Sequence, residues 1–271
     1  MYKVKFKTIY IFLFIIISLS IVNCSDDPVS VVDTSDFRYP FTDGSYWNYK
    51  RTITISDIRP DSILNYFLNN PTVITGTVTI LYDTLINSVL TKCFLDEFTS
   101  EGMTRSNRYY YINNDTALIL YSARAHPASG LFPLSIIRNS NIISSEINGN
   151  FNYNLNDNSN SGEPLSSTLK YPIVTGTEWS FDNGNVETTK KYSGFEIVTT
   201  PSVTTSCMKE KTTYSSIPND PIYNYYSKFG LLKRTQFIND FEFSTITYPD
   251  GIGIIDINDE SEILSFSIPS N

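Results

Sequence analysis

Two stretches of the sequence match each other position by position. The first, Tyr39 to Tyr49, reads YPFTDGSYWNY, and the second, Tyr171 to Phe181, reads YPIVTGTEWSF. Tyrosine, proline, glycine, tryptophan and a final aromatic residue fall in the same register in both. Trp47 and Trp179 are the two tryptophans of the chain, and we expect each to anchor the core of one repeat. The match predicts an internal duplication.

Two further features recur in the same order. Cys93 follows a threonine by two positions in the first half, and Cys207 does so in the second. A tyrosine cluster comes after each cysteine, at 109–111 and at 223–226. Alternate residues of a strand face opposite sides, so we expect at least one tyrosine of each cluster to pack inward. The alternative is that the rings face a sugar or a partner.

The composition indicates a β protein. The 271 residues include 19 Tyr and 17 Phe, and aromatic and β-branched residues favour strands. Short alternating segments separated by turns predict an all-β fold of two tandem antiparallel modules, each a twisted sheet, half-barrel or sandwich. The predicted strands are 73–82, 92–98, 108–112, 117–122, 195–200, 207–214, 222–227, 231–237, 241–248 and 252–257.

We expect at most one or two short helices. The segment from Pro60 to Leu68 predicts a short capped helix, on the surface or across one end of the sheet. Turns are predicted at Asn113–Asp115 and at Pro249–Gly251, where proline fixes φ and glycine supplies a positive φ. These turns predict that the flanking strands pair as hairpins.

The N-terminus has the pattern of an export signal. Lys3, Lys5 and Lys7 precede an apolar stretch from Ile9 to Val22. At about 1.5 Å per residue this stretch reaches roughly 21 Å, which is shorter than the roughly 30 Å hydrocarbon core of a bilayer. Residues 1–23 are therefore predicted to be a signal peptide and not a membrane span.

The end of this segment resembles the lipobox of bacterial lipoproteins. It reads Ile21-Val22-Asn23-Cys24, and Asn23 departs from the Gly, Ala or Ser that is usual before the cysteine. The following Ser25-Asp26-Asp27 is similar to the acidic export tag of Bacteroidota-type lipoproteins. This resemblance implies that Cys24 is acylated, as with palmitate, and that the membrane-anchored protein lies in the outer membrane, facing the cell surface.

The repeats resemble those of uncharacterised Bacteroidota-type outer-membrane and surface lipoproteins. These repeats open with an aromatic-Pro-x-x-x-Gly-x-x-Trp motif and close with Tyr-Tyr-x-x-x-Gly-Leu. The segment from Tyr225 to Leu231 matches the closing motif, whereas Asn114-Asp115 stands where the first half would carry the glycine. The resemblance spans most of residues 37–240 and implies fold and location without an activity.

The domain organisation follows from these features. Residues 1–23 are the predicted lipoprotein signal peptide and 24–36 a tether. Residues 37–147 form the first β-repeat, 148–168 an Asn/Ser-rich linker, and 169–271 the second β-repeat with a C-terminal hairpin.

Several classes of chemistry receive no support from the sequence. The net charge of −8 disfavours nucleic-acid binding, and the single histidine, His126, lies in a loop context without a second histidine for a metal site. Acidic segments at 154–160 and 256–262 do not fit the EF-hand pattern, so we expect no metal and no cofactor. No motif places a nucleophile beside a base, and we assign no catalytic residue.

Cys93 and Cys207 leave two alternatives open. An exported protein permits a disulfide between them, and the other reading is two separately packed core thiols. A disulfide requires Cα atoms within about 7 Å of each other.

The sequence thus predicts a lipid-anchored, non-enzymatic envelope protein with a binding or structural role, whose partners are the membrane and an envelope protein or glycan. An alternative is a carrier that holds a lipid or other apolar ligand in a concave sheet. A hydrolase with an unrecognised site is a third reading.

Overall fold

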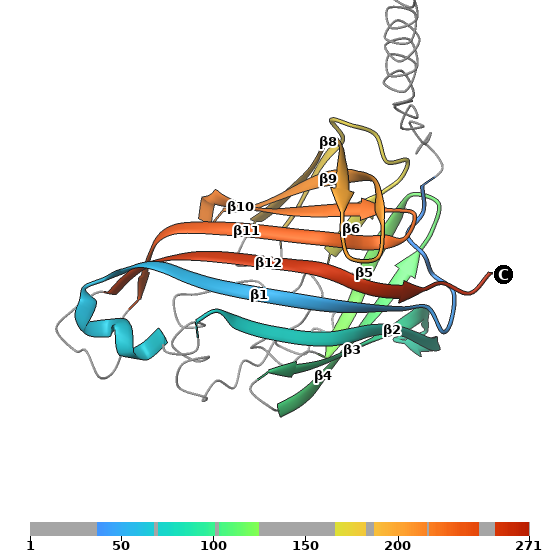
Figure 1. Ribbon diagram of the computed structural model, residues 1–271. Coiled ribbons are helices and arrows are strands. Elements are labelled where there is room, and N and C mark those ends of the chain that lie inside the picture. The colour runs from blue at the N-terminus through green and yellow to red at the C-terminus, as the bar shows by residue number, and fades with distance from the viewer. Residues whose placement is uncertain are drawn as a thin grey trace, which may run out of the picture. The chain divides into compact units, whose positions relative to one another are not determined.

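The fold is a single antiparallel sheet of twelve strands (Figure 1). The structure is a computed structural model and describes residues 37–67, 70–100, 103–124, 166–182, 187–215, 217–243 and 253–270. The strand order is β6-β5-β4-β3-β2-β1-β12-β11-β10-β9-β8-β7. The strands are β1 (Tyr46–Arg59), β2 (Thr72–Ile86), β3 (Val89–Ser100), β4 (Met103–Asn113), β5 (Ala117–Arg124), β6 (Ser166–Lys170), β7 (Glu178–Asp182), β8 (Glu187–Thr199), β9 (Thr204–Tyr214), β10 (Ile217–Ser227), β11 (Gly230–Phe243) and β12 (Gly253–Ser267).

Both predicted repeats contribute to this one sheet. Strands β1 to β6 follow one another on one side, β7 to β12 on the other, and β1 pairs with β12 where the halves meet. The prediction of an all-β antiparallel fold is confirmed. The internal duplication itself stays a prediction. Strand β6 begins at Ser166, so it takes in the last residues of the segment predicted to be a linker.

The two matching sequence motifs form the same local turn. Gly44 and Gly176 both have a positive φ, of 80° and 90°, which glycine adopts without steric cost. The amide of Gly44 donates to the carbonyl of Ile80 on β2 at 2.9 Å, and the amide of Gly176 donates to that of Tyr192 on β8 at 2.8 Å. Each turn therefore fixes the start of its tryptophan strand against the next strand of the chain.

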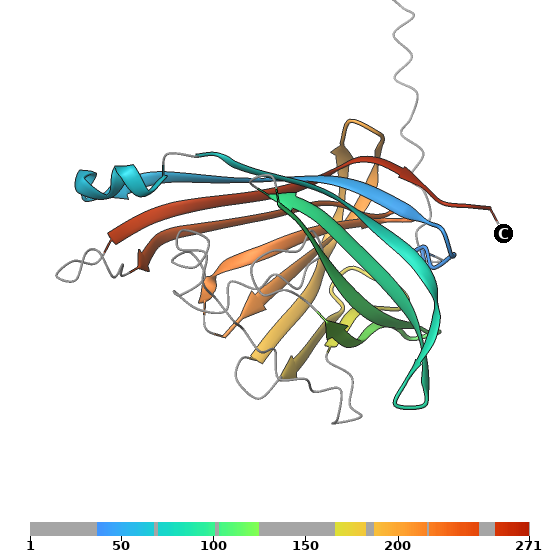
Figure 2. The same cartoon turned by 90° about the horizontal axis from the view of Figure 1, so that it is seen from below.

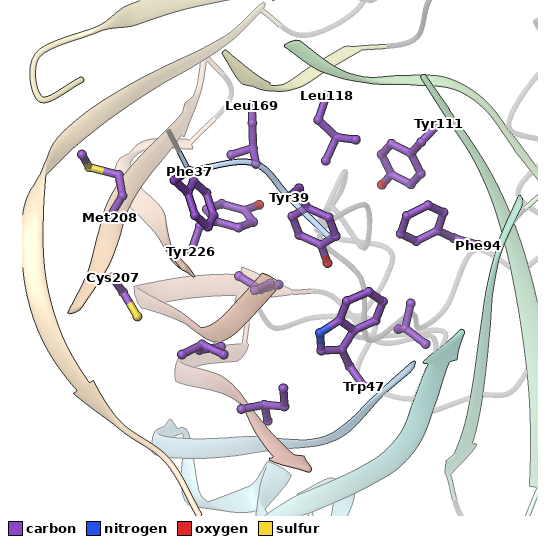
Figure 3. Packing of buried hydrophobic residues seen from close by; sticks show 14 of the residues in the cluster. Phe37, Tyr39, Trp47, Phe94, Tyr111, Leu118, Leu169, Cys207, Met208 and Tyr226 are labelled. Carbon is purple, nitrogen blue, oxygen red and sulfur yellow. The ribbon is translucent and has the colours of Figure 1, made fainter. Parts of the chain in front are cut away.

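The sheet curls around a core that is rich in aromatic rings (Figure 2). Tyr39, which precedes β1, lies among Trp47, Phe94 and Tyr226, as Figure 3 shows. Its ring centroid is 5.8 Å from that of Trp47 and 6.4 Å from those of Phe94 and Tyr226. We call the following fully buried residues the aromatic cluster. They are Tyr39, Trp47, Tyr49, Phe94, Tyr111 and Tyr226.

The edge strand β6 is joined to β7 and β8 by side chains. The hydroxyl of Tyr192 donates to the carbonyl of Lys170 at 2.8 Å and accepts from its amide at 2.9 Å. The indole N–H of Trp179 donates to the carbonyl of Ser167 at 3.0 Å. These bonds satisfy backbone groups of β6 that would otherwise lack a strand partner. We call this junction the seam.

The predicted short helix is present as the 3-10 helix η1 (Asp61–Phe67). Its Ile63 and Phe67 are buried against Ile238 on β11 and Ile257 on β12. The turn at Asn113–Asp115 is also confirmed, because the side-chain oxygen of Asn114 accepts from the amide of Ala117 at 2.9 Å.

The C-terminal strands differ from the prediction. Residues up to Phe243 continue β11 through an irregularity and do not begin a new strand. Strand β12 runs well past Ile257 to Ser267, because the acidic segment continues the alternation of buried and exposed residues. The predicted turn at Pro249–Gly251 lies outside the described residues. Among the described residues, no helix is long and apolar enough to cross a membrane.

Candidate functional site

Five polar side chains form a continuous row across the inner face of the sheet. Arg51 on β1 is the cross-strand partner of Ser261 on β12, which also opposes Arg234 on β11. Arg234 in turn opposes Asn224 on β10, and Asn224 opposes Glu210 on β9. Directly opposed residues have Cβ atoms about 4.5–5.5 Å apart. None of the five is more than 6% exposed, and we call them the polar row.

The alternation of strand residues places the polar row next to the aromatic cluster. Tyr49 and Arg51 lie two positions apart along β1, and so do Asn224 and Tyr226 along β10. Because side chains two positions apart share a face, the inner surface changes from aromatic to polar within one step along these strands. The rigid pairing on both sides fixes where each polar group lies.

Arg51 is fully engaged along one edge of its guanidinium. Its Nε donates to Oδ1 of Asp259 at 2.9 Å, and its Nη2 donates to Oδ2 at 2.7 Å. Burial raises the pKa of Asp259, but the charge and hydrogen bonds of Arg51 and the charge of Arg234 outweigh burial, so the pKa lies below its ordinary value. Asp259 is therefore a buried carboxylate held ionised by a bidentate arginine.

Glu210 is the acceptor centre at the other end of the polar row. Its Oε1 accepts from the hydroxyl of Thr212 at 2.6 Å, and its Oε2 accepts from Nδ2 of Asn224 at 2.6 Å. The ammonium of Lys190 lies 3.8 Å from Oε1 and donates to the carbonyl of Thr168 at 3.3 Å. Burial lowers the pKa of Lys190, and the charge of Glu210 opposes that lowering.

Arg234 differs from Arg51 in its hydrogen bonds. It is 4% exposed, yet its Nε and Nη2 have no hydrogen-bond partner in the described part of the chain. Burial lowers the pKa of Arg234, and the charge of Asp259 opposes the lowering; an arginine nonetheless keeps its charge at neutral pH. The side-chain oxygen of the neighbouring Asn224 is also buried without a partner there.

A second cluster of charges lies on the exposed side of β1, β11 and β12. Asp57, Asp240 and Asp256 bring carboxylate oxygens within 4.8 Å of one another. The guanidinium of Arg59 lies 2.9 Å from Asp57 and 2.5 Å from Asp240, so a cation of the chain already occupies this acidic cluster. Asp256 belongs to the acidic segment considered for calcium, whereas the segment 154–160 lies outside the described residues.

The structure places the predicted core residues as follows. Trp47 is fully buried on β1, with its indole N–H donating to the carbonyl of Phe229 at 2.6 Å, and Trp179 is 5% exposed on β7. Cys93 on β3 and Cys207 on β9 are both buried free thiols, and five strands separate β3 from β9 in the sheet. Burial raises the pKa of Cys207 to about 12. Cys24 and His126 lie outside the described residues.

The two tyrosine clusters differ in burial. All three tyrosines of the first cluster, 109–111, and Tyr226 of the second are buried, which confirms that each cluster has an inward member. Tyr223 and Tyr225 are half-buried, and the ammonium of Lys209 lies 4.6 Å and 5.7 Å from their ring centroids.

The polar row does not stand out in the amino-acid sequence. The acidic segment 256–262, which does not fit the EF-hand pattern, belongs to strand β12, and its inward member Asp259 pairs with Arg51. A period of two over Ile255, Ile257, Asp259, Ser261 and Ile263 is the signal that predicts one strand face. The partners come from distant strands, which no local pattern specifies.

Comparisons with known proteins gave two solved structures. One is from Bacteroides fragilis and is described as an exported protein with a YmcC-like fold; it has 12% identity and a TM-score of 0.40, with 85% of this chain and 99% of that chain covered. The other, from Parabacteroides distasonis, is described as a lipoprotein, with 12% identity, a TM-score of 0.32 and coverage of 85% and 98%. No family model matches the chain. No curated protein matches it.

Proposed function

We propose that this chain is a lipid-anchored, non-enzymatic binding protein of the bacterial envelope. Cys24 carries the acyl chains that hold it in the outer membrane, and the sheet faces the cell surface. The observation that supports a binding role is the polar row, in which buried donors and acceptors are held at fixed positions on paired strands. Preorganised groups of this kind lower the entropic cost of holding a ligand.

The anchor is supported by the lipobox-like segment that ends at Cys24. Two or three acyl chains, at about 0.8 kcal/mol for each buried CH₂, are sufficient for stable attachment. The glycan or protein partners that the sequence suggests belong to this proposal, and Tyr223, Tyr225 and Lys209 offer a ring-and-cation surface on the outer face.

A carrier of an apolar ligand receives less support. Rings of the chain itself fill the inner face at the aromatic cluster. The adjoining inner face carries Arg234, and an apolar ligand there would leave its Nε and Nη2 without hydrogen bonds.

The anchor is tested by fractionating cells that express Cys24→Ser. We expect the variant to leave the membrane fraction, whereas the matched Cys93→Ser variant stays there. External protease should degrade the wild-type protein on intact cells. A Cys24→Ser protein that remains membrane-bound would contradict the lipid anchor, and protection from protease would contradict the surface location.

A further inference from the structure

The two arginines of the polar row differ in the hydrogen bonding of Nε and Nη2, which form one edge of the guanidinium. In Arg51 the edge formed by Nε and Nη2 holds both oxygens of a carboxylate. In Arg234 the same two atoms are buried without a partner among the described residues. A buried donor left without a hydrogen bond is costly, and more so when it is charged. The edge of Arg234 formed by Nε and Nη2 therefore has the geometry for bidentate binding of a carboxylate, and such binding would satisfy both donors.

Two buried carboxylates of this interior, Asp259 and Glu210, are already hydrogen-bonded. Both oxygens of Asp259 accept from Arg51, and both oxygens of Glu210 accept from Thr212 and Asn224. Neither bonds to Arg234, although Asp259 is close enough to influence its pKa. Asp96 is the third buried carboxylate of the described residues, and it makes no hydrogen bond to Nε or Nη2 of Arg234 either. A carboxylate that binds this edge of Arg234 would therefore come from outside the described residues.

Asn224, next to Arg234, presents an acceptor where Arg234 presents donors. Its Nδ2 donates to Glu210 at 2.6 Å, which fixes the orientation of the amide, and its Oδ1 is a buried acceptor without a partner there. Asn224 is the direct cross-strand neighbour of Arg234 on the inner face. A ligand that fills both groups presents two acceptor oxygens and, next to them, a hydrogen-bond donor.

The buried charges indicate which donor that is. The charged residues that the structure describes as buried comprise three cations and three anions, so the interior is already balanced. They are Arg51, Lys190, Arg234, Asp96, Glu210 and Asp259. A ligand without net charge keeps this balance, because an unpaired charge in a low-dielectric interior is costly. A carboxylate next to an ammonium meets all of these requirements.

We propose that Arg234 and Asn224 form a binding site for a small zwitterion of the amino-acid class. The carboxylate binds the Nε–Nη2 edge of Arg234, and the ammonium donates to Oδ1 of Asn224. The proposal rests on the proposed binding function and names its ligand class. It is independent of the anchor at Cys24, so the fractionation experiment and the binding experiment fail separately.

The test is calorimetric titration of the full-length protein in detergent with glycine, the smallest probe that carries both groups. Saturable binding is expected, with acetate binding at least about 10-fold more weakly, because it lacks one hydrogen bond and brings a net charge into the interior, and with methylammonium not binding. Absence of glycine binding would overturn the proposal, and so would acetate binding as tightly as glycine.

Substitutions of Arg234 test whether glycine binds at this residue. Arg234→Met should lower glycine affinity at least about 30-fold, and Arg234→Lys should also weaken it, since lysine lacks the bidentate edge. The matched control Arg108→Met makes the same change at an exposed strand position and should leave affinity unchanged. Glycine affinity that is unaffected by Arg234→Met and Arg234→Lys would contradict the assignment. Circular dichroism of each variant confirms folding.

Discussion

The aromatic cluster and the polar row occupy adjoining parts of the same inner face but satisfy their polar atoms differently. In the aromatic cluster, Tyr49 donates its hydroxyl to the carbonyl of Leu231 at 2.7 Å and Trp47 donates its indole N–H to that of Phe229, whereas the neutral hydroxyls of Tyr39 and Tyr226 have no hydrogen-bond partner among the described residues. In the polar row, Nε and Nη2 of Arg51 hold a carboxylate, whereas the same two atoms of Arg234 have no hydrogen-bond partner among the described residues. An unpaired charged donor costs more than an unpaired neutral hydroxyl, which is why the binding site that we propose lies in the polar row and not in the aromatic cluster.

The largest effect should come from alkaline pH, which acts on the aromatic cluster. Burial raises the pKa values of Tyr49, Tyr111 and Tyr226 well above 10. Since the folded pKa exceeds the unfolded one, their contribution to stability is complete below about pH 10 and is lost as the pH rises further. We expect cooperative unfolding above that pH, with tyrosinate absorbance and circular dichroism changing together.

Two variants localise this effect. Tyr49→Phe removes one ionisable hydroxyl from the aromatic cluster and should make the alkaline unfolding less steep in pH. Tyr82→Phe removes a hydroxyl from an exposed ring and should not. Tyrosinate absorbance that rises gradually while the circular dichroism stays native would contradict the burial of these rings.

The next effect concerns the contact between Gly230 and Trp47. Gly230 has a φ of 102°, and a Cβ added there would lie 3.0 Å from Nε1 of Trp47. Gly230→Ala should lower the free energy of unfolding by about 2–4 kcal/mol, through the positive φ and the displacement of the indole. Urea denaturation measures the change.

Gly176→Ala is the matched control for this substitution. Gly176 also has a positive φ, of 90°, but an added Cβ would meet nothing within 4 Å. Its cost should be limited to the backbone, about 1–2 kcal/mol. Equal costs for the two variants would show that the packing against Trp47 contributes nothing.

The smallest effect is expected where the polar row meets the seam. Tyr192 is the cross-strand partner of Glu210 and bonds to both backbone groups of Lys170. Tyr192→Phe should lower the free energy of unfolding by about 1–2 kcal/mol and should speed amide hydrogen exchange in β6. The exposed Tyr46→Phe variant should do neither, and unchanged exchange in Tyr192→Phe would contradict the seam.

The sequence supports the fold better than it supports the site. Aromatic and β-branched composition, the Asn114 turn and the segment from Pro60 to Leu68 predict local structure, because each depends on neighbours in the chain. The pairing of β1 with β12 joins residues more than 200 positions apart, as the bond from Arg51 to Asp259 shows. The polar row depends on that pairing, so the chain pattern alone does not reveal which charges meet.

The most direct test of the division within the polar row is urea unfolding of Arg51→Met and Arg234→Met, each without ligand. Arg51→Met leaves Asp259 buried without its cation, and we expect a loss of about 3–5 kcal/mol. Arg234→Met removes a buried charge that has no hydrogen-bond partner at Nε or Nη2 among the described residues, and we expect stability equal to or above that of the wild type. Equal losses in the two variants would contradict the account.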